Sequence, residues 1–391
     1  MRLLSFTVSN YRSFLDEQTI VFDVGNKNVD AILGPNGSGK SNLFFAIGFF
    51  RDFIRTSTNF EGQMMRYVSF MLSDATDLAP TSFQAEMQTT KHVYRYTFSL
   101  IREKVVDEAL SRRGIAKDAS YETLFRRKSL HTGRYEKYGF DSNLLRSTRD
   151  DALVLTRAWE NNNQHAVDIF DWLEHLKPIS GGQPMGLTAQ RIIEDEGFKA
   201  KLLDLLRRAD LYIQDVAATK INMPDELFNS LPIKDEFKKK IDRTGYNVTT
   251  THTIRNDDGE VVGMKALPME LESEGTRRIF ELAFPLIDTL EQGNILYIDE
   301  FETHLHPREC EFIAGLFMGK DNTSNAQLIV NTHNTQIMNQ VGRNNVHLFG
   351  KNNREATVIG SIPKDVVRLD DPALEKKYNK GAFGAVPNIG K

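Results

Sequence analysis

The feature that most constrains this chain is a glycine-rich octapeptide, Gly34–Ser41, with the sequence GPNGSGKS. An apolar run, Ala31–Leu33, comes directly before it, and Asn42–Phe53 after it has the apolar spacing of an amphipathic helix. In this order of strand, glycine loop and helix, unpaired N–H groups converge on one point, where the helix dipole favours an anion. The segment therefore predicts a phosphate-binding loop in an α/β domain.

The loop also predicts which side chains bind the ligand. Lys40 is expected to reach the β- and γ-phosphates of ATP, and the hydroxyl of Ser41 is expected to bind Mg²⁺. The residues expected to hold the nucleotide are Asn36, Gly37, Ser38, Gly39, Lys40, Ser41 and Asn42.

A second apolar strand, Asn294–Ile298, ends in two carboxylates, Asp299 and Glu300. In a parallel sheet such a strand presents its last residues at the carboxyl edge, where the phosphate loop also lies. Beside the loop, Asp299 is expected to hold Mg²⁺ through water and Glu300 to orient the water that attacks the γ-phosphate. Without the loop, the pair is more simply interpreted as a strand end at the surface.

A third apolar strand, Gln327–Asn331, leads into His333. A single histidine is usually structural, but this one follows a buried strand at the same sheet edge. We therefore expect His333 to hydrogen-bond the γ-phosphate and the attacking water. The segment His304–His306 resembles a metal motif, yet no third ligand follows at helical spacing, so we interpret it as a turn.

The segment Glu272–Thr276 precedes a predicted helix, Arg277–Leu290. Ser273 and Gly275 at the helix start would form a second anion site, for the same dipole and donor reasons as the first. An ordinary N-cap is the alternative interpretation. Two phosphate sites in a chain with one phosphate loop indicate that two subunits share each nucleotide.

The apolar patterns predict an α/β fold with a mixed, largely parallel sheet, because continuous apolar strands alternate with helices. Alternation within 81–110 adds an antiparallel β subdomain, and helical spacing across 150–245 predicts an inserted helical subdomain. Hairpin turns are expected around Thr132 and at Asn256–Gly259. Three divisions of the chain are expected: 1–110 with the phosphate loop, 111–244 with a hairpin and the helical insertion, and 245–391 with Ser273 and Gly275, the acidic strand and His333.

Composition narrows the class of protein. The 49 Lys and Arg against 53 Asp and Glu give a net charge of −4, which argues against a polycation that coats nucleic acid. The one cysteine, Cys310, excludes an internal disulfide and fits a reducing cytoplasm. We see neither a signal peptide nor an apolar stretch near the ~20 residues that span a bilayer, so a soluble cytoplasmic protein is expected.

With these motifs the chain resembles the ABC-type ATPase heads of chromosome-maintenance, Rad50, RecF and OLD proteins. Within that group it is similar to the AAA15 family of prokaryotic ATPases. The segments that carry the resemblance are Asn10–Phe14, the phosphate loop, Ser273–Thr276 as the signature, Asp299–Pro307, Thr332–Asn334 as the switch, and Lys380–Ile389.

The resemblance implies that ATP on the phosphate loop of one subunit is closed over by the signature of another. Ser273 and Gly275 would then act in trans, and Arg12 would touch the nucleotide. Gln84 is the candidate for the glutamine of the family's Q-loop. The residues that would act in cis are Lys40, Ser41, Asp299, Glu300 and His333.

Several AAA15-like proteins act in anti-phage defence beside a separately encoded nuclease or toxin. The resemblance thus implies a homodimeric or larger ATPase that senses infection and controls such an effector. From Ser41 to Ser273 is 232 positions, too few for a long coiled coil. The 58 residues after His333 are too few for the nuclease domain of OLD proteins, so we expect any nuclease to be another chain.

A RecF-like DNA-binding ATPase in repair is the alternative function. The segment 101–149 holds 12 Lys and Arg against 7 Asp and Glu, including Arg112, Arg113 and the run Arg126–Lys128. Those charges would contact DNA phosphates only if they converge in space, and a solvated strand face is the other interpretation. A scaffold that binds ATP without turnover is a third hypothesis, and Glu300 and His333 argue against it.

Overall fold

The structure, a computed structural model, groups the chain into two compact units. The first unit contains Met1–Ile179, Thr289–Glu302 and Ile313–Lys391, and the second contains Ser180–Asp288 and Thr303–Phe312. The expected three-way division of the sequence stays a prediction. The residues that the structure describes are 1–22, 27–59, 66–73, 76–116, 118–128, 140, 142–181, 185–222, 228, 243–363, 367–368 and 371–386.

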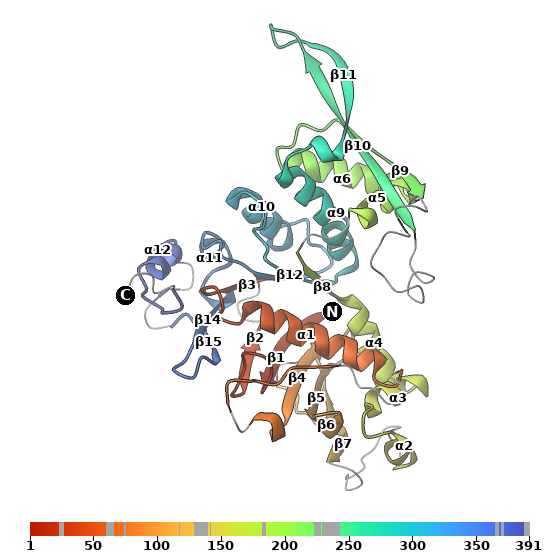
Figure 1. Cartoon of the computed structure of the whole chain (residues 1–391), viewed down its shortest axis with the longest axis vertical. Coiled ribbons are helices and arrows are strands. Elements are labelled where there is room, and N and C mark those ends of the chain that lie inside the picture. Colours follow the sequence, from red (N-terminus) through yellow and green to blue (C-terminus); the bar gives the residue numbers. More distant parts are fainter. Residues whose placement is uncertain are drawn as a thin grey trace. The chain divides into compact units, whose positions relative to one another are not determined.

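A mixed six-stranded sheet forms the centre of the first unit (Figure 1). Neighbouring pairs β14–β3, β3–β13 and β13–β12 are parallel, and β15 is antiparallel to β14. Every residue of β3, β12 and β13 is buried, as their continuous apolar sequences predicted. The mixed, largely parallel sheet is thus confirmed. In spatial order the strands are β15 (Thr357–Ser361), β14 (Val346–Lys351), β3 (Val29–Leu33), β13 (Gln327–Asn331), β12 (Ile295–Asp299) and β8 (Leu176–Ser180).

The second sheet of this unit is antiparallel, which confirms the β subdomain expected from alternation. Along β4 every second residue is buried, and Phe83 of β4 lies opposite Phe98 of β5. The hairpin turn expected around Thr132 lies outside the described residues. The strand order is β2 (Gln18–Val21), β1 (Arg2–Ser9), β4 (Thr81–Gln88), β5 (Val93–Ile101), β6 (Lys104–Arg113) and β7 (Glu122–Lys128).

Helix α1 (Lys40–Thr56) begins directly after the phosphate loop and packs against both sheets. The ring of Phe50 lies 5.6 Å from that of Phe98 in the antiparallel sheet. The ring of Phe44 lies 5.2 Å from that of Tyr297 in β12. Burying each phenylalanine contributes roughly 1.5–3 kcal/mol, so the helix that begins at the loop is firmly anchored in the core.

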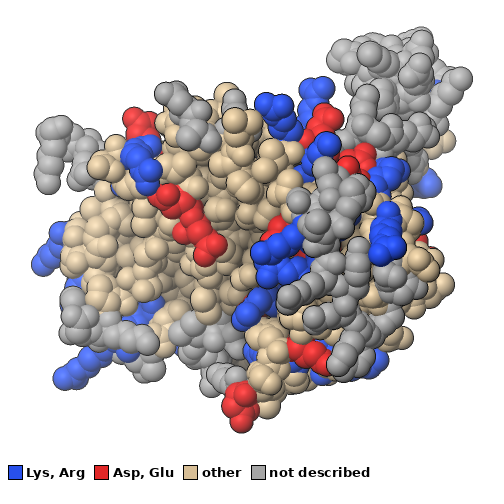
Figure 2. Space-filling view, turned by 90° about the horizontal axis from the view of Figure 1, so that it is seen from below, with Lys and Arg blue, Asp and Glu red and all other residues tan. Residues whose placement is uncertain are grey.

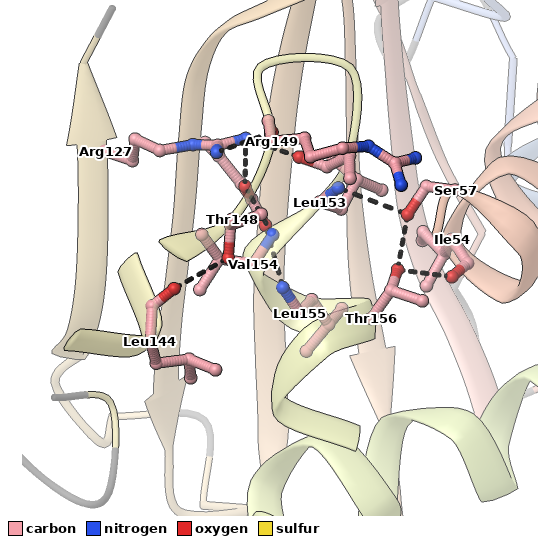
Figure 3. Close-up of polar contacts among 12 residues, drawn as sticks. Ile54, Ser57, Arg127, Leu144, Thr148, Arg149, Leu153, Val154, Leu155 and Thr156 are labelled. Carbon is pink, nitrogen blue, oxygen red and sulfur yellow. Dashed lines mark hydrogen bonds and ion pairs between the residues drawn. The ribbon is translucent and has the colours of Figure 1, made fainter. Parts of the chain in front are cut away.

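The far end of α1 is fastened by hydroxyl groups to α3 (Val154–Glu160), as Figure 3 shows. The hydroxyls of Ser57 and Thr156 lie 2.7 Å apart, and Ser57 Oγ also accepts the N–H of Leu153 at 3.1 Å. Thr156 Oγ1 donates to the carbonyl of Ile54 at 2.6 Å. The other helices here are α2 (Ser142–Ser147) and α4 (Gln164–His175).

The second unit contains helices α5 (Gly186–Glu194) and α6 (Glu196–Arg208), as expected for the helical insertion. It also contains a strand that helical spacing did not predict, β9 (Asp215–Asn222). β9 pairs along its length with β10 (Thr244–Arg255), which continues through the predicted turn into β11 (Val261–Pro268). The apolar alternation that predicts a strand is weak in β9 because most of its residues are exposed, and exposed positions need not be apolar.

The remaining helices follow the chain toward its end. α9 (Glu274–Gln292) contains the whole of the predicted helix Arg277–Leu290, and α10 (Pro307–Met318) follows β12 in the chain. α11 (Ile337–Val341) and α12 (Leu374–Asn379) were not expected from the sequence. Among the described residues, no helix combines the length and apolar character needed to cross a membrane.

Candidate functional site

The phosphate loop requires glycine at two positions for different reasons. Gly37 has a φ of 75° and Gly39 a φ of 106°, in the left-handed region that side chains disfavour. A Cβ at Gly37 would meet no atom within 4 Å, so only the backbone demands glycine there. At Gly39 a Cβ would overlap Thr357 Oγ1, so the close packing of the loop demands it as well.

Two hydroxyl residues from distant parts of the sequence hold the loop in this conformation. Thr357, on β15, has its Oγ1 2.8 Å from the carbonyl oxygen of Ser38, to which it donates. A second hydrogen bond, also 2.8 Å, joins Thr357 Oγ1 to Ser13 Oγ, and Ser13 Oγ accepts from Asn42 Nδ2 at 2.7 Å. Sequence reasoning missed Thr357, because a lone threonine in a polar stretch carries no signal.

Lys40 is nearly buried, with 8% of its surface exposed. Its ammonium donates to the carbonyl oxygens of Gly34 at 2.9 Å and Pro35 at 3.3 Å, and lies 3.2 Å from Nε2 of His333. Burial lowers the pKa of Lys40, and the carboxylates of Glu302 and Asp299 act in the opposite direction. The positive charge is thus held at the mouth of the loop, where a phosphate would bind.

The expected metal ligands, Ser41 and Asp299, lie side by side. The hydroxyl of Ser41 donates to Asp299 Oδ1 at 3.3 Å, and Asp299 is 4% exposed. The same oxygen accepts from Asn331 Nδ2 at 2.7 Å, and Asn331 Oδ1 accepts from the hydroxyl of Tyr297 at 2.9 Å. This chain of hydrogen bonds fixes the carboxylate, and two hard oxygen donors at this spacing fit Mg²⁺.

Asn331 is a site residue that the sequence analysis placed at a strand end without assigning it a role. The available signal was an amide side chain closing an otherwise apolar strand. The backbone of Asn331 also takes part, because its carbonyl accepts the N–H of Phe301 at 3.0 Å. This bond folds the chain back after Glu300, which has a left-handed φ of 53° and an exposed side chain.

His333 lies at the end of the neighbouring strand, as expected. Desolvation, followed by the nearby positive charge of Lys40, lowers the pKa of His333. The imidazole is therefore neutral at pH 7, and its Nε2 is available as a hydrogen-bond acceptor for Lys40.

These side chains surround one cavity of about 230 Å³ in the first unit. The structure therefore brings together the phosphate loop, both carboxylates of β12 and its following turn, and the switch histidine. The residues that line it are Asn36, Gly37, Ser38, Gly39, Lys40, Ser41, Asn42, Asp299, Glu300, Asn331 and His333.

Arg12, which was expected to touch the nucleotide, is not among those lining residues. Its guanidinium carbon lies 4.3 Å from the ring centroid of Phe45, on α1. The side chain is exposed, and its backbone N–H donates to the carbonyl of Val68 at 2.9 Å. Gln84, the candidate for the Q-loop glutamine, lies in β4, where its Oε1 accepts a hydrogen bond from the hydroxyl of Thr97.

A comparison with known protein families identifies the family to which the chain belongs. The sequence profile of the family described as "AAA domain, putative AbiEii toxin, Type IV TA system" matches residues 31–339, well over half of the chain. The chain belongs to this AAA-domain family. The matched range contains the phosphate loop, the acidic strand and the switch histidine.

Two solved structures are similar to this AAA-domain protein. The SMC head domain from Thermotoga maritima is 15% identical, with a TM-score of 0.39, and the match covers 93% of this chain and 100% of that one. The Smc head domain from Pyrococcus furiosus, with an extended coiled coil and bound to the C-terminal domain of ScpA, is 11% identical, with a TM-score of 0.41, covering 93% and 97%. No curated protein matches the sequence significantly.

The signature residues of this AAA-domain protein lie in the second unit. Ser273 Oγ accepts the N–H of Thr276 at 3.1 Å, so Ser273 acts as an N-cap of α9, which was the alternative interpretation. A Cβ at Gly275 would come within 3.2 Å of the carbonyl oxygen of His304. His304 lies in a turn, as expected, and its Nδ1 is 2.8 Å from Glu274 Oε2. The action of Ser273 and Gly275 in trans stays a prediction.

Several arginines in the described part of the basic segment form ion pairs within the first unit. Arg127 forms an ion pair with the fully buried Glu108 at 3.1 Å and donates to the carbonyl of Ala152 at 2.7 Å. On the face shown in Figure 2, Lys and Arg lie in small groups with Asp and Glu among them. Two further ion pairs are Arg126 with Asp107 at 3.2 Å and Arg112 with Glu122 at 3.3 Å.

Proposed function

We propose that this protein is an ABC-type ATPase head that hydrolyses ATP with Mg²⁺ and acts as a molecular switch. The observation that carries the proposal is the convergence of five side chains on one cavity at the end of a parallel sheet. They come from the phosphate loop, from the end of β12 and from the end of β13. The five are Lys40, Ser41, Asp299, Glu300 and His333.

Each of the groups that line the cavity would have a distinct role in binding or hydrolysing the nucleotide. The loop N–H groups and Lys40 would bind the phosphates, for which the Lys40 ammonium must leave the carbonyls of Gly34 and Pro35. Ser41 and Asp299 would hold Mg²⁺, which supplies positive charge beside the β- and γ-phosphates. Glu300 would orient a water in line with the γ-phosphate.

Hydrolysis then breaks the bond between the γ-phosphorus and the bridging oxygen, and the water oxygen takes its place. The proton of the water passes to Glu300 and from there to solvent. The neutral imidazole of His333 contacts Lys40 and lines the same cavity as Glu300, so it would hydrogen-bond the γ-phosphate and distinguish ATP from ADP.

A second copy of the chain would complete the site. The start of α9 supports this, because Ser273 is exposed at a helix N-terminus, where the helix dipole favours an anion. Closure over ATP and reopening after hydrolysis would couple nucleotide state to a partner protein in the cytoplasm.

The role in antiviral defence rests on the resemblance to AAA15-like proteins, which act beside a separately encoded nuclease or toxin. The family description supports a second candidate, because it names a putative toxin of a toxin–antitoxin system. In that case the chain itself would be the toxic component. The ion pairs of Arg112, Arg126 and Arg127 weigh against the RecF-like alternative.

Steady-state ATP hydrolysis of the Glu300→Gln variant tests the ATPase assignment. We expect a loss of roughly a hundredfold or more, since activation of the water is removed while nucleotide binding remains. Glu17→Gln, an exposed change on the same unit, is the matched control. Full hydrolysis by Glu300→Gln would show that another residue orients the water.

The same variant tests the switch. With ATP it should accumulate as a dimer in a mass measurement, and chains that co-purify with it from phage-infected cells would identify the effector. Growth arrest caused by the wild-type chain expressed alone would instead favour the toxin assignment.

A further inference from the structure

We propose that Glu302 is a positioning residue that fixes the switch histidine, an inference that rests on the ATPase function proposed above. Glu302 lies two residues after Glu300, in the turn that follows β12. Its Oε1 accepts the backbone N–H of His333 at 2.9 Å. Its Oε2 accepts the hydroxyl of Thr332 at 2.7 Å. One carboxylate thus binds two consecutive residues of the switch, which lie thirty positions further along the chain.

Both bonds use a carboxylate oxygen of Glu302 as the acceptor. A backbone N–H only donates, so His333 N requires an acceptor, and bonds to a charged oxygen are stronger than those to a neutral one. A glutamine at this position offers a single acceptor oxygen. If that oxygen accepts from His333, its NH₂ group faces the Thr332 hydroxyl; in the opposite orientation, two donors face each other.

The carboxylate acts on the reaction through His333 and not by direct contact with the nucleotide. Glu302 is absent from the residues that line the 230 Å³ cavity, whereas His333 is among them. The backbone of His333 is held by Glu302, and its ring reaches Lys40 on the opposite wall. Thr332 adds to this rigidity, because its Oγ1 also accepts the N–H of Asn334 at 3.0 Å.

The proposal separates Glu302 from its neighbour Glu300. Glu300 has an exposed carboxylate that lines the cavity, as required of a residue that orients water. Glu302 has both of its oxygens engaged with the switch. Loss of Glu300 should therefore affect the chemical step directly. Loss of Glu302 should act mainly through His333, with a smaller effect through its charge on Lys40.

A double-mutant cycle with Glu302→Gln and His333→Ala tests this dependence. We expect Glu302→Gln to lower kcat for ATP by roughly tenfold to a hundredfold, with a smaller change in KM. In the His333→Ala background the same substitution should cost less than about twofold, because its target is gone. Losses that simply multiply in the double variant would overturn the proposal, as would an unchanged kcat in Glu302→Gln.

A second measurement does not depend on turnover. The Cε1–H NMR signal of His333, assigned with His333→Ala, should shift in nucleotide-free Glu302→Gln protein, while the signal of the distant His347 stays in place. An unmoved His333 signal would contradict the positioning role. Absence of ATP hydrolysis in the wild-type protein would instead reject the proposed function and leave the NMR result to decide the positioning role.

A variant of Thr332, the second residue bound by Glu302, keeps the proposal testable if Glu302→Gln does not fold. Thr332→Val removes the hydroxyl that Glu302 accepts, and Thr332→Ser retains it. We expect Thr332→Val to reduce kcat and shift the His333 signal in the same direction as Glu302→Gln, with Thr332→Ser close to wild type. Wild-type kcat in Thr332→Val would count against the proposal.

Discussion

The ammonium of Lys40 lies 3.2 Å from Nε2 of His333, although 293 positions separate the two residues in the sequence. The lysine of the phosphate loop and the histidine that follows β13 are therefore direct partners. The lowered pKa of His333, caused by desolvation and by Lys40 itself, suits this contact, because a neutral ring nitrogen accepts a hydrogen bond from an ammonium. In the proposed function, binding of a triphosphate would replace this contact and so link occupancy of the loop to the position of His333.

Replacement of Lys40 by methionine should abolish tight nucleotide binding. The side chain keeps its length and apolar stem but loses a charge-assisted hydrogen bond to phosphate, so affinity should fall roughly tenfold to a hundredfold. Titration with a fluorescent ATP analogue gives the dissociation constant. Lys351→Met, a change in β14, is the control, and equal affinity for Lys40→Met and wild type would contradict the assignment.

Asp299→Asn should raise the Mg²⁺ concentration needed for hydrolysis. The carboxylate beside Ser41 would lose its charge, and an amide oxygen is a weaker ligand for a hard cation. Half-maximal activity should therefore require roughly tenfold more Mg²⁺, as measured by titration at saturating ATP. Asp118→Asn, at an exposed position, should leave the requirement unchanged.

Gly39→Ala should both destabilise the protein and remove nucleotide binding. The new Cβ would overlap the hydroxyl of Thr357 on a backbone with φ of 106°, at a cost of about 1–3 kcal/mol. Gly48→Ala is a sharp control, since this glycine lies inside α1 and its Cβ would meet no atom within 4 Å. By helix propensity Gly48→Ala should stabilise the fold by up to ~1 kcal/mol in urea unfolding. A Gly39→Ala protein with wild-type stability would show that the loop adapts.

Glu108→Gln should be among the most destabilising single changes in the first unit. The carboxylate is fully buried, faces Arg127, and accepts the N–H groups of Val154 and Leu155 at the start of α3. Removal of its charge leaves the guanidinium buried without a counter-ion, so we expect a loss of about 3–5 kcal/mol in the free energy of unfolding. The partly exposed Glu122 pairs with Arg112 at the surface, and Glu122→Gln should cost less than about 1 kcal/mol.

Asp30 should make stability depend on pH. Burial raises its pKa to about 6, against the hydrogen bonds from His347 and Asn345. Because this is above the value of about 3.9 in an unfolded chain, its contribution to stability is complete below pH 4 and is lost as pH rises through 6.

Asp30→Asn removes this titration. The melting temperature of the variant, relative to wild type, should be higher at pH 8 than at pH 4, by an amount that corresponds to on the order of 1–3 kcal/mol. Thermal melts at the two values of pH provide the measurement, with the exposed Asp16→Asn as control. An equal difference at both values would show that burial does not disfavour the carboxylate of Asp30.

The parts of this protein that could be predicted from the sequence are those whose signals lie within a short segment of the chain. Gly34–Ser41 between an apolar strand and a helix predicts a phosphate loop because the N–H groups that bind phosphate are close together in the chain. The fully buried strands β12 and β13 were recognisable because each has an uninterrupted apolar run at its centre. Their carboxyl ends then placed Asp299, Glu300 and His333 at one edge, as the cavity now shows.

The way in which these groups are held depends on contacts that form only in the folded chain. Thr357 contacts the loop, Asn331 orients Asp299, and Glu302 binds the backbone of His333, each through bonds between residues far apart in the sequence. Such contacts leave no periodic pattern, since a single polar residue looks the same whether it meets solvent or a distant partner. The same reason explains why charge counting in 101–149 suggested a basic surface, while Arg127 is buried against Glu108.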